Sequence, residues 1–169
     1  MERAGQAMER GVQALLGDLE RSGPEGVGAP VRGVAVLARD VGDLFPGAVD
    51  PLARRRRRAG AARLARRALS LGTAVHGVIA DRPDTARAWS WNMRELEHRM
   101  DRVQAVGNGE ACVRALARVA GLVLELPPLA DEDDWQVGLI AFADETVLAE
   151  LHEACLELAA SALMVAVSA

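Results

Sequence analysis

The sequence predicts an all-α protein, a single-domain helical bundle of about six helices. Half of the 169 residues are apolar but only 3% are aromatic, and Ala and Leu, which favour helices, dominate the apolar set. The apolar residues recur at spacings of three and four rather than in alternation, which indicates helices with one buried stripe. A single domain of this length buries about 70% of the surface that its unfolded chain exposes.

The first two helices are predicted at 2–21 and 30–45. The first has apolar residues that recur at four- and three-residue spacing. The segment 22–30 contains three glycines and two prolines, which predicts a flexible loop. Pro30 suits the first turn of the second helix, and a Pro-Gly pair follows its end.

The third and fourth helices are predicted at 51–80 and 84–106. Asp50 and Pro51 form a helix-start signal, an N-cap residue followed by proline at the first helical position. Gly60 weakens the third helix by about 1 kcal/mol relative to Ala, so a break near it is the alternative to a continuous helix. The fourth helix has the most regular apolar stripe in the chain.

The last two helices are predicted at 109–126 and 133–167. Two prolines end the former, and four acidic residues at 131–134 favour the start of the latter, because the helix dipole attracts negative charge there. A helix over 133–167 is about 50 Å long, compared with about 30 Å for the first helix. Its far end therefore overhangs the bundle.

The overhanging end predicts an interface, because an apolar helix end is not left in water. We expect Leu163, Val165 and Val167 to contact a second copy of the chain or another protein. The alternative is that the third helix, which has a similar length, covers this end within the protomer.

Charge is strongly segregated along the chain. Residues 51–80 carry eight arginines and no acid, whereas residues 119–169 carry ten acids and no arginine. Five consecutive arginines, called the arginine run below, point all round a helix, so they project into solvent or against an anionic group. The arginine run is Arg54, Arg55, Arg56, Arg57 and Arg58, and the other three arginines are Arg63, Arg66 and Arg67.

Three partners compete for these arginines. The favoured one is the acidic last helix, lying beside the third helix within one protomer or across a dimer, because charge runs are usually solvated or internally paired. The second is nucleic acid, whose phosphates arginine neutralises. A net charge of −4 and the lack of aromatic residues within the arginine run place it second. The third is an anionic protein or a lipid surface.

Few residues invite a chemical interpretation. His76 shares a helix face with Gly72, which predicts a partly buried ring that borders a pocket or bonds a carbonyl or carboxylate in the core. Trp91 lies off its apolar stripe, which predicts an exposed indole that anchors an interface. Glu95 and His98 have the spacing of bundle metal ligands, but they face solvent and a second such pair is absent. We therefore expect no metal site, no cofactor and no catalytic residue.

Cysteine usage predicts a reducing compartment. Cys112 and Cys155 fall at core positions of their helices, with His152 at the edge of the same stripe, which suits buried free thiols. The first ten residues are charged and lack the apolar core of a signal peptide, and the apolar C-terminal stretch is too short for a membrane span. A cytoplasmic location follows. The use of arginine for all 20 basic residues indicates a GC-rich bacterial coding sequence.

Together these patterns predict a non-enzymatic interaction or assembly protein. We expect a homodimer or a complex with another protein, formed by the arginine-rich helix and an acidic surface. A nucleic-acid-associated subunit that binds phosphates through the arginine run is the alternative. A small-ligand-binding or catalytic bundle with a pocket near His76 is the second alternative.

Overall fold

The computed structural model of the chain describes residues 2–45, 51–80, 85–100, 109–131 and 133–168. These residues form seven α-helices and a short 3₁₀ helix, with no strand among them, so the all-α bundle is confirmed. The elements are α1 (Glu2–Ser22), α2 (Pro30–Gly42), α3 (Pro51–Ile79), α4 (Thr85–Met100), α5 (Gly109–Leu124), η1 (Pro128–Asp131), α6 (Trp135–Phe142) and α7 (Glu145–Ser168).

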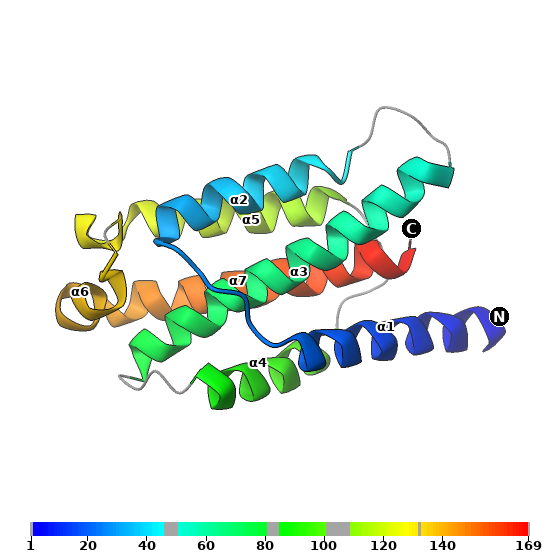
Figure 1. Ribbon diagram of the computed structural model, residues 1–169, viewed down its shortest axis with the longest axis horizontal. Coiled ribbons are helices and arrows are strands. Elements are labelled where there is room, and N and C mark those ends of the chain that lie inside the picture. The colour runs from blue at the N-terminus through cyan, green and yellow to red at the C-terminus, as the bar shows by residue number, and fades with distance from the viewer. Residues whose placement is uncertain (1, 46–50, 81–84, 101–108, 132, 169) are drawn as a thin grey trace.

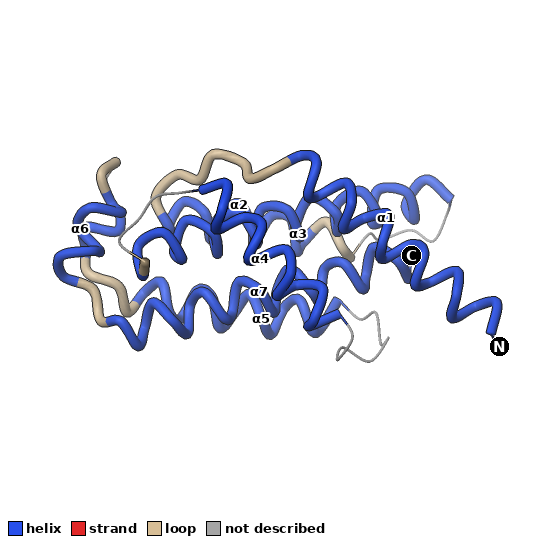
Figure 2. The backbone as a smooth tube through the Cα atoms, turned by 90° about the horizontal axis from the view of Figure 1, so that it is seen from below, coloured by secondary structure: helices blue, strands red, loops and turns tan. Residues whose placement is uncertain are grey.

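The helix α7 is the centre of the bundle (Figure 1). Its contact with α3 is the most extensive in the described chain, and it also packs against α5, α4 and α1. The helix α2 packs against α3 and α5. The short helix α6 contacts α3 and η1 and lies at one end of the long axis, as both views show (Figure 2).

The central position of α7 follows from its residues. Buried positions run almost without interruption from 154 to 166, and five of them are alanines. A helix that is apolar on every side needs neighbours on every side, and small side chains let those neighbours approach closely. Among the described helices, α7 is the one long and apolar enough to cross a membrane, yet 67% of its most apolar stretch is buried within the bundle.

Gly72 lies at a close approach of α3 and α7. A Cβ at this position would lie 3.1 Å from Cβ of Cys155 and 3.8 Å from Cδ2 of His152. The missing side chain of Gly72 therefore sets the distance between the two helices. The space beside this glycine, where one of the two alternatives for His76 placed a pocket, is occupied by Cys155 and His152 of α7.

The predicted helix over 133–167 is wrong, because the structure divides it into α6 and α7. Ala143 has an extended backbone, with φ −82° and ψ 149°, which ends α6. Asp144 then caps α7, since its Oδ1 accepts a hydrogen bond of 2.8 Å from the backbone N–H of Thr146. The periodicity of the apolar residues continues across this junction, so periodicity alone did not predict the break.

The expected overhang of the last helix is also wrong. Leu163 is fully buried and Val165 is 1% exposed, both inside the protomer. Val167 is half-buried and lies against Gly11 of α1. The helix α7 is shorter than predicted, and the 29-residue helix α3 covers it within one protomer. These three residues therefore do not form a surface for a second copy.

The other helices begin and end close to their predicted positions. Helix α3 continues through Gly60, which is buried near Asp43, so the alternative break does not occur. The predicted end of the fourth helix at 106 and the N-cap at Asp50 lie outside the described residues.

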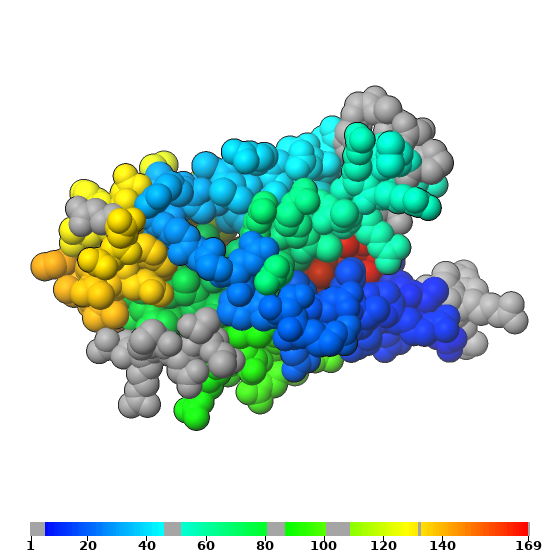
Figure 3. Space-filling model, viewed as in Figure 1, coloured from blue at the N-terminus to red at the C-terminus, as the bar shows by residue number. Residues whose placement is uncertain are grey.

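The loop before α2, residues 23–29, is called the strap below, and it is tied to α3. Ser70 accepts a hydrogen bond of 2.9 Å from the backbone N–H of Glu25. The guanidinium of Arg66 donates to the carbonyl of Gly23 at 3.1 Å. The surface view shows the strap lying across the bundle between α1 and α2 (Figure 3).

Candidate partner-binding surface

The arginine run begins α3 at the end of the bundle opposite α6 (Figure 1). Arg54, Arg55, Arg56 and Arg58 are exposed, and Arg57 is half-buried. In the described part of the chain, none of the five takes part in an ion pair. Four exposed guanidinium groups, none of them in an ion pair with a described residue, therefore lie within little more than one helical turn.

Arg57 differs because its side chain turns toward the core. Its Nε is buried without a hydrogen-bond partner among the described residues. The charge of Arg57 acts on Cys112 of α5. Burial raises the pKa of this thiol to about 11, and the nearby Arg57 opposes that increase.

The second half of the basic segment behaves in the opposite way, because its arginines are paired within the protomer. Asp40 of α2 is 2% exposed, and Nη1 of Arg67 lies 2.7 Å and 2.8 Å from its two carboxylate oxygens. This contact, with further help from Glu25, raises the pKa of Arg67. Arg63 lies 3.5 Å from both Asp40 and Asp43, and Arg66 lies 2.9 Å from Glu25.

The sequence favoured pairing of these arginines with the acidic last helix. Arg63, Arg66 and Arg67 are paired within the protomer, but with acids of α2 and the strap. The acidic helix α7 does lie beside α3, but the contact between them is apolar. Two acids of α7 pair instead with other helices. Glu153 accepts from Arg99 of α4, and Glu157 lies 3.0 Å from Arg118 of α5.

Apolar side chains lie at the same end of the bundle as the arginine run. Leu52 precedes the run on α3 and is 56% exposed. Phe45 follows α2 and is 53% exposed, and its ring covers Gly109, where a Cβ would come within 2.6 Å of Cζ. The surface formed by the arginine run, Leu52 and Phe45 is called the basic end below. Mixed guanidinium and apolar groups of this kind are typical of protein-binding surfaces.

A second group of residues joins α3, α4 and α7 in a polar cluster. The rings of His76, Trp91 and His152 contact one another, with the centroid of His76 4.8 Å from that of Trp91 and 5.1 Å from that of His152. His152 places its Nε2 at 2.8 Å from Oδ1 of Asn92. Asn92 is fully buried and donates to Oγ1 of Thr73 at 3.1 Å. The sequence offered no periodic signal for this cluster, because its members come from three separate helices.

The cluster is built for packing rather than for proton transfer near neutral pH. Burial, together with the neighbouring His76, lowers the pKa of His152 to about 4. The ring is therefore neutral at pH 7 and is held by Asn92. His76 is half-buried, with its Nδ1 buried and unpartnered among the described residues. Trp91 is 41% exposed, as an interface residue would be, but its ring also packs on both histidines.

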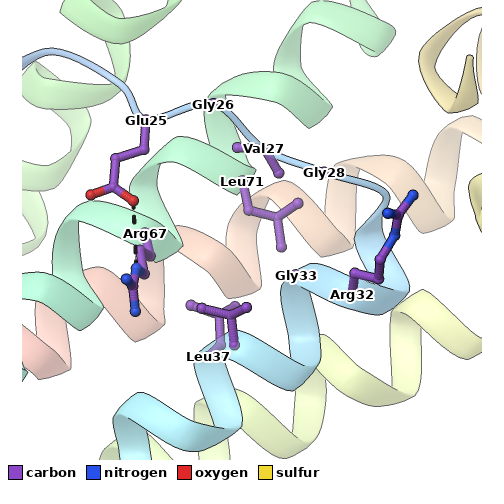
Figure 4. A pocket seen from close by; sticks show the side chains of 10 residues that line it. Glu25, Gly26, Val27, Gly28, Arg32, Gly33, Leu37, Arg67 and Leu71 are labelled. Atoms are coloured by element: carbon purple, nitrogen blue, oxygen red, sulfur yellow. Dashed lines mark hydrogen bonds and ion pairs between the residues drawn. The ribbon is translucent and has the colours of Figure 1, made fainter. Parts of the chain in front are cut away.

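The cavity in Figure 4 lies beneath the strap and has a volume of about 230 Å³. Leu37 and Leu71 line it from α2 and α3, and Val27 lines it from the strap. Arg67 and Glu25 close one side, and they neutralise each other across 3.4 Å. Arg32 also lines this small cavity, and its ion pair with Asp133, at 3.4 Å, is exposed. Among the described lining residues, the cavity therefore offers a ligand little free polarity beyond this one weakly paired cation.

Glu95 and His98 line a separate surface hollow together with Glu153 and Glu157. Within the described ranges, no three His, Cys, Asp or Glu side chains are grouped closely enough to hold a metal ion.

Comparisons of the chain with protein-family models, with curated proteins and with solved structures found no match. The function is therefore argued from the residues and their geometry alone.

Proposed function

We propose that this protein is a non-enzymatic interaction protein that binds an anionic protein surface through its basic end. The observation that carries the proposal is the contrast within α3: Arg63, Arg66 and Arg67 are paired with acids, whereas the arginine run has no ion pair among the described residues. Like charges on one helical turn repel each other. Binding of a partner that neutralises these charges therefore lowers the free energy of the complex.

The apolar side chains at the basic end favour a protein as the partner. Leu52 and Phe45 are both more than half exposed, and burying them adds a hydrophobic contribution that a phosphate backbone does not offer. Nucleic acid is the second candidate, because the same four exposed arginines can neutralise phosphates. Both candidate functions use the same four arginines. They differ in whether an acidic polypeptide or a nucleic acid binds these arginines more tightly.

The test compares two variants that carry the same change of net charge. One replaces Arg54, Arg55, Arg56 and Arg58 by Gln. The matched control replaces Arg10, Arg39, Arg94 and Arg114 by Gln, which are exposed arginines elsewhere on the bundle. Binding of a labelled polyglutamate peptide and of a short duplex DNA is measured by fluorescence anisotropy over a range of salt concentrations.

We expect polyglutamate to bind the wild type, and its affinity to fall by about tenfold or more in the first variant, with little change in the control. If polyglutamate binds the two variants equally, the proposal is overturned. Duplex DNA that binds far more tightly than polyglutamate, with log K falling against log salt at a slope of about −4, would replace the proposal with the nucleic-acid candidate.

Both thiols are buried and free, so we also propose a reducing, cytoplasmic environment.

A further inference from the structure

The end of the bundle opposite the arginine run carries exposed apolar residues. Helix α6 buries Trp135 and Leu139 against the bundle but presents its other face to solvent. Val137 is 69% exposed, Ile140 is 44% exposed and Phe142 is 71% exposed. Apolar groups gathered on one short helix are unfavourable in water and mark a contact surface.

Acidic residues flank these apolar side chains in the chain. The exposed acids before and after α6 are Asp131, Asp133, Asp134, Asp144 and Glu145. In the described ranges they form one ion pair, between Asp133 and Arg32, at 3.4 Å and with side chains that are 99% and 64% exposed. An ion pair this exposed contributes little to the stability of the fold. The surface made by α6 and these five acids is called the acidic end below.

The two ends of the bundle are therefore complementary. The basic end combines exposed guanidinium groups with Leu52 and Phe45, and the acidic end combines exposed carboxylates with Val137, Ile140 and Phe142. They lie at opposite ends of the long axis in both views, so one protomer cannot bring its own two ends together (Figures 1 and 2).

We propose that the protein assembles head to tail, with the basic end of one copy docked on the acidic end of the next. This inference rests on the proposed function and names a second copy of the chain as its partner. Pairing unlike ends joins opposite charges and buries the apolar residues of both surfaces. A symmetric pair through either end would instead place like charges face to face. A contact between unlike surfaces at opposite ends repeats, so it joins more than two protomers, in an open chain or in a closed ring.

The test uses two variants that each disable one end. The basic-end variant replaces Arg54, Arg55, Arg56 and Arg58 by Gln, and the acidic-end variant replaces Val137, Ile140 and Phe142 by Gln. All of these residues are exposed, so both variants should fold, and circular dichroism checks this. A second acidic-end variant, with Asp131, Asp133 and Asp134 replaced by Asn, removes charge alone.

Sedimentation velocity at low salt should show wild-type species that grow beyond a dimer as the protein concentration rises. Each variant alone should sediment as a 17.9 kDa monomer. An equimolar mixture of the basic-end and acidic-end variants retains one intact contact, so it should form a one-to-one heterodimer and nothing larger. The control with Arg10, Arg39, Arg94 and Arg114 replaced by Gln should assemble as the wild type does.

A wild type that stays monomeric up to about 1 mM would overturn the head-to-tail contact. So would a mixture of the two variants that stays monomeric, or a variant that still forms a dimer by itself. If polyglutamate binding depends on the arginine run while the purified protein stays monomeric, the proposed function stands and only the choice of a second copy fails. If polyglutamate does not bind and the mixed variants do not associate, both proposals fail.

Discussion

Nε2 of His152 on α7 lies 2.8 Å from Oδ1 of Asn92 on α4. The amide nitrogen of Asn92 donates to Thr73 on α3, which turns its oxygen toward the histidine. Because that oxygen only accepts, His152 donates to it through Nε2. One chain of hydrogen bonds thus ties together three helices.

The first prediction concerns pH. Burial lowers the pKa of His152 to about 4, whereas the unfolded chain has the ordinary value of 6.5. The unfolded state therefore binds more protons between these two values, and the free energy of unfolding falls as the pH falls through this window. The loss is on the order of 3 kcal/mol and is complete below the folded-state pKa. Urea unfolding across this pH range measures it.

The control for this prediction replaces His152 by Gln. This variant should be less stable at neutral pH but should lose less stability on acidification than the wild type. The exposed His98, replaced by Gln, should leave the pH dependence unchanged. An equal pH dependence in the wild type and the His152→Gln variant would contradict the prediction.

The second prediction concerns Asp40. Replacing it by Asn removes the charge that Arg67 contacts at 2.7 Å and 2.8 Å, in a position that is 2% exposed. We expect a loss of about 2 kcal/mol, at the lower end for a buried pair because Arg67 keeps Glu25 as a partner. Chemical denaturation measures this loss. The matched control is Asp18→Asn, whose partner Arg21 lies on the surface, and it should change stability by less than about 0.5 kcal/mol.

The third prediction concerns Gly72. Ala at this position gains helix propensity, but its Cβ would lie 3.1 Å from Cβ of Cys155, an atom fixed to the backbone of α7. The two helices must separate, so we expect a net loss of about 1–2 kcal/mol in thermal or urea unfolding. Gly121 on α5 provides the comparison, because a Cβ added there would meet no neighbouring atom within 4 Å. Gly121→Ala should stabilise the protein by up to about 1 kcal/mol.

The fourth prediction concerns the two thiols. Burial raises the pKa of Cys112 to about 11 and that of Cys155 to about 12, so neither forms a thiolate near neutral pH. A thiol reagent should label the native protein only as fast as it unfolds, and should label both residues at once in denaturant. Rapid labelling of either cysteine in the native protein would show that its helix opens locally.

The positions of most helices could be predicted from the sequence because an apolar stripe is a local signal. Stripe spacing, the Pro30 start and the glycine-rich loop are readable over a few residues, and the structure reproduces them. The break at Ala143 was missed because the apolar pattern continues across it. Its usable signal was Asp144, a residue that favours helix N-caps.

Contacts between helices were not predictable from local patterns. The sequence indicated the charge of α3 correctly, but Asp40 and Glu25 are its partners only because the strap and α2 fold back over it. The sequence predicted His152 at the edge of the apolar stripe of the last helix, and Trp91 as an exposed interface residue by itself. Their packing around His76 depends on the rotation of three helices about their axes, which no single stripe defines.

The central position of α7 has a consequence for the order of folding. The helices α1, α3, α4 and α5 all pack on a helix that the ribosome makes after them. Until that helix emerges, the apolar faces of the earlier helices have no common core, and the partner of α3 is far away in the chain. We therefore expect the nascent protein to remain loosely collapsed through most of its synthesis, in need of protection from aggregation, and to acquire its native packing in one late step.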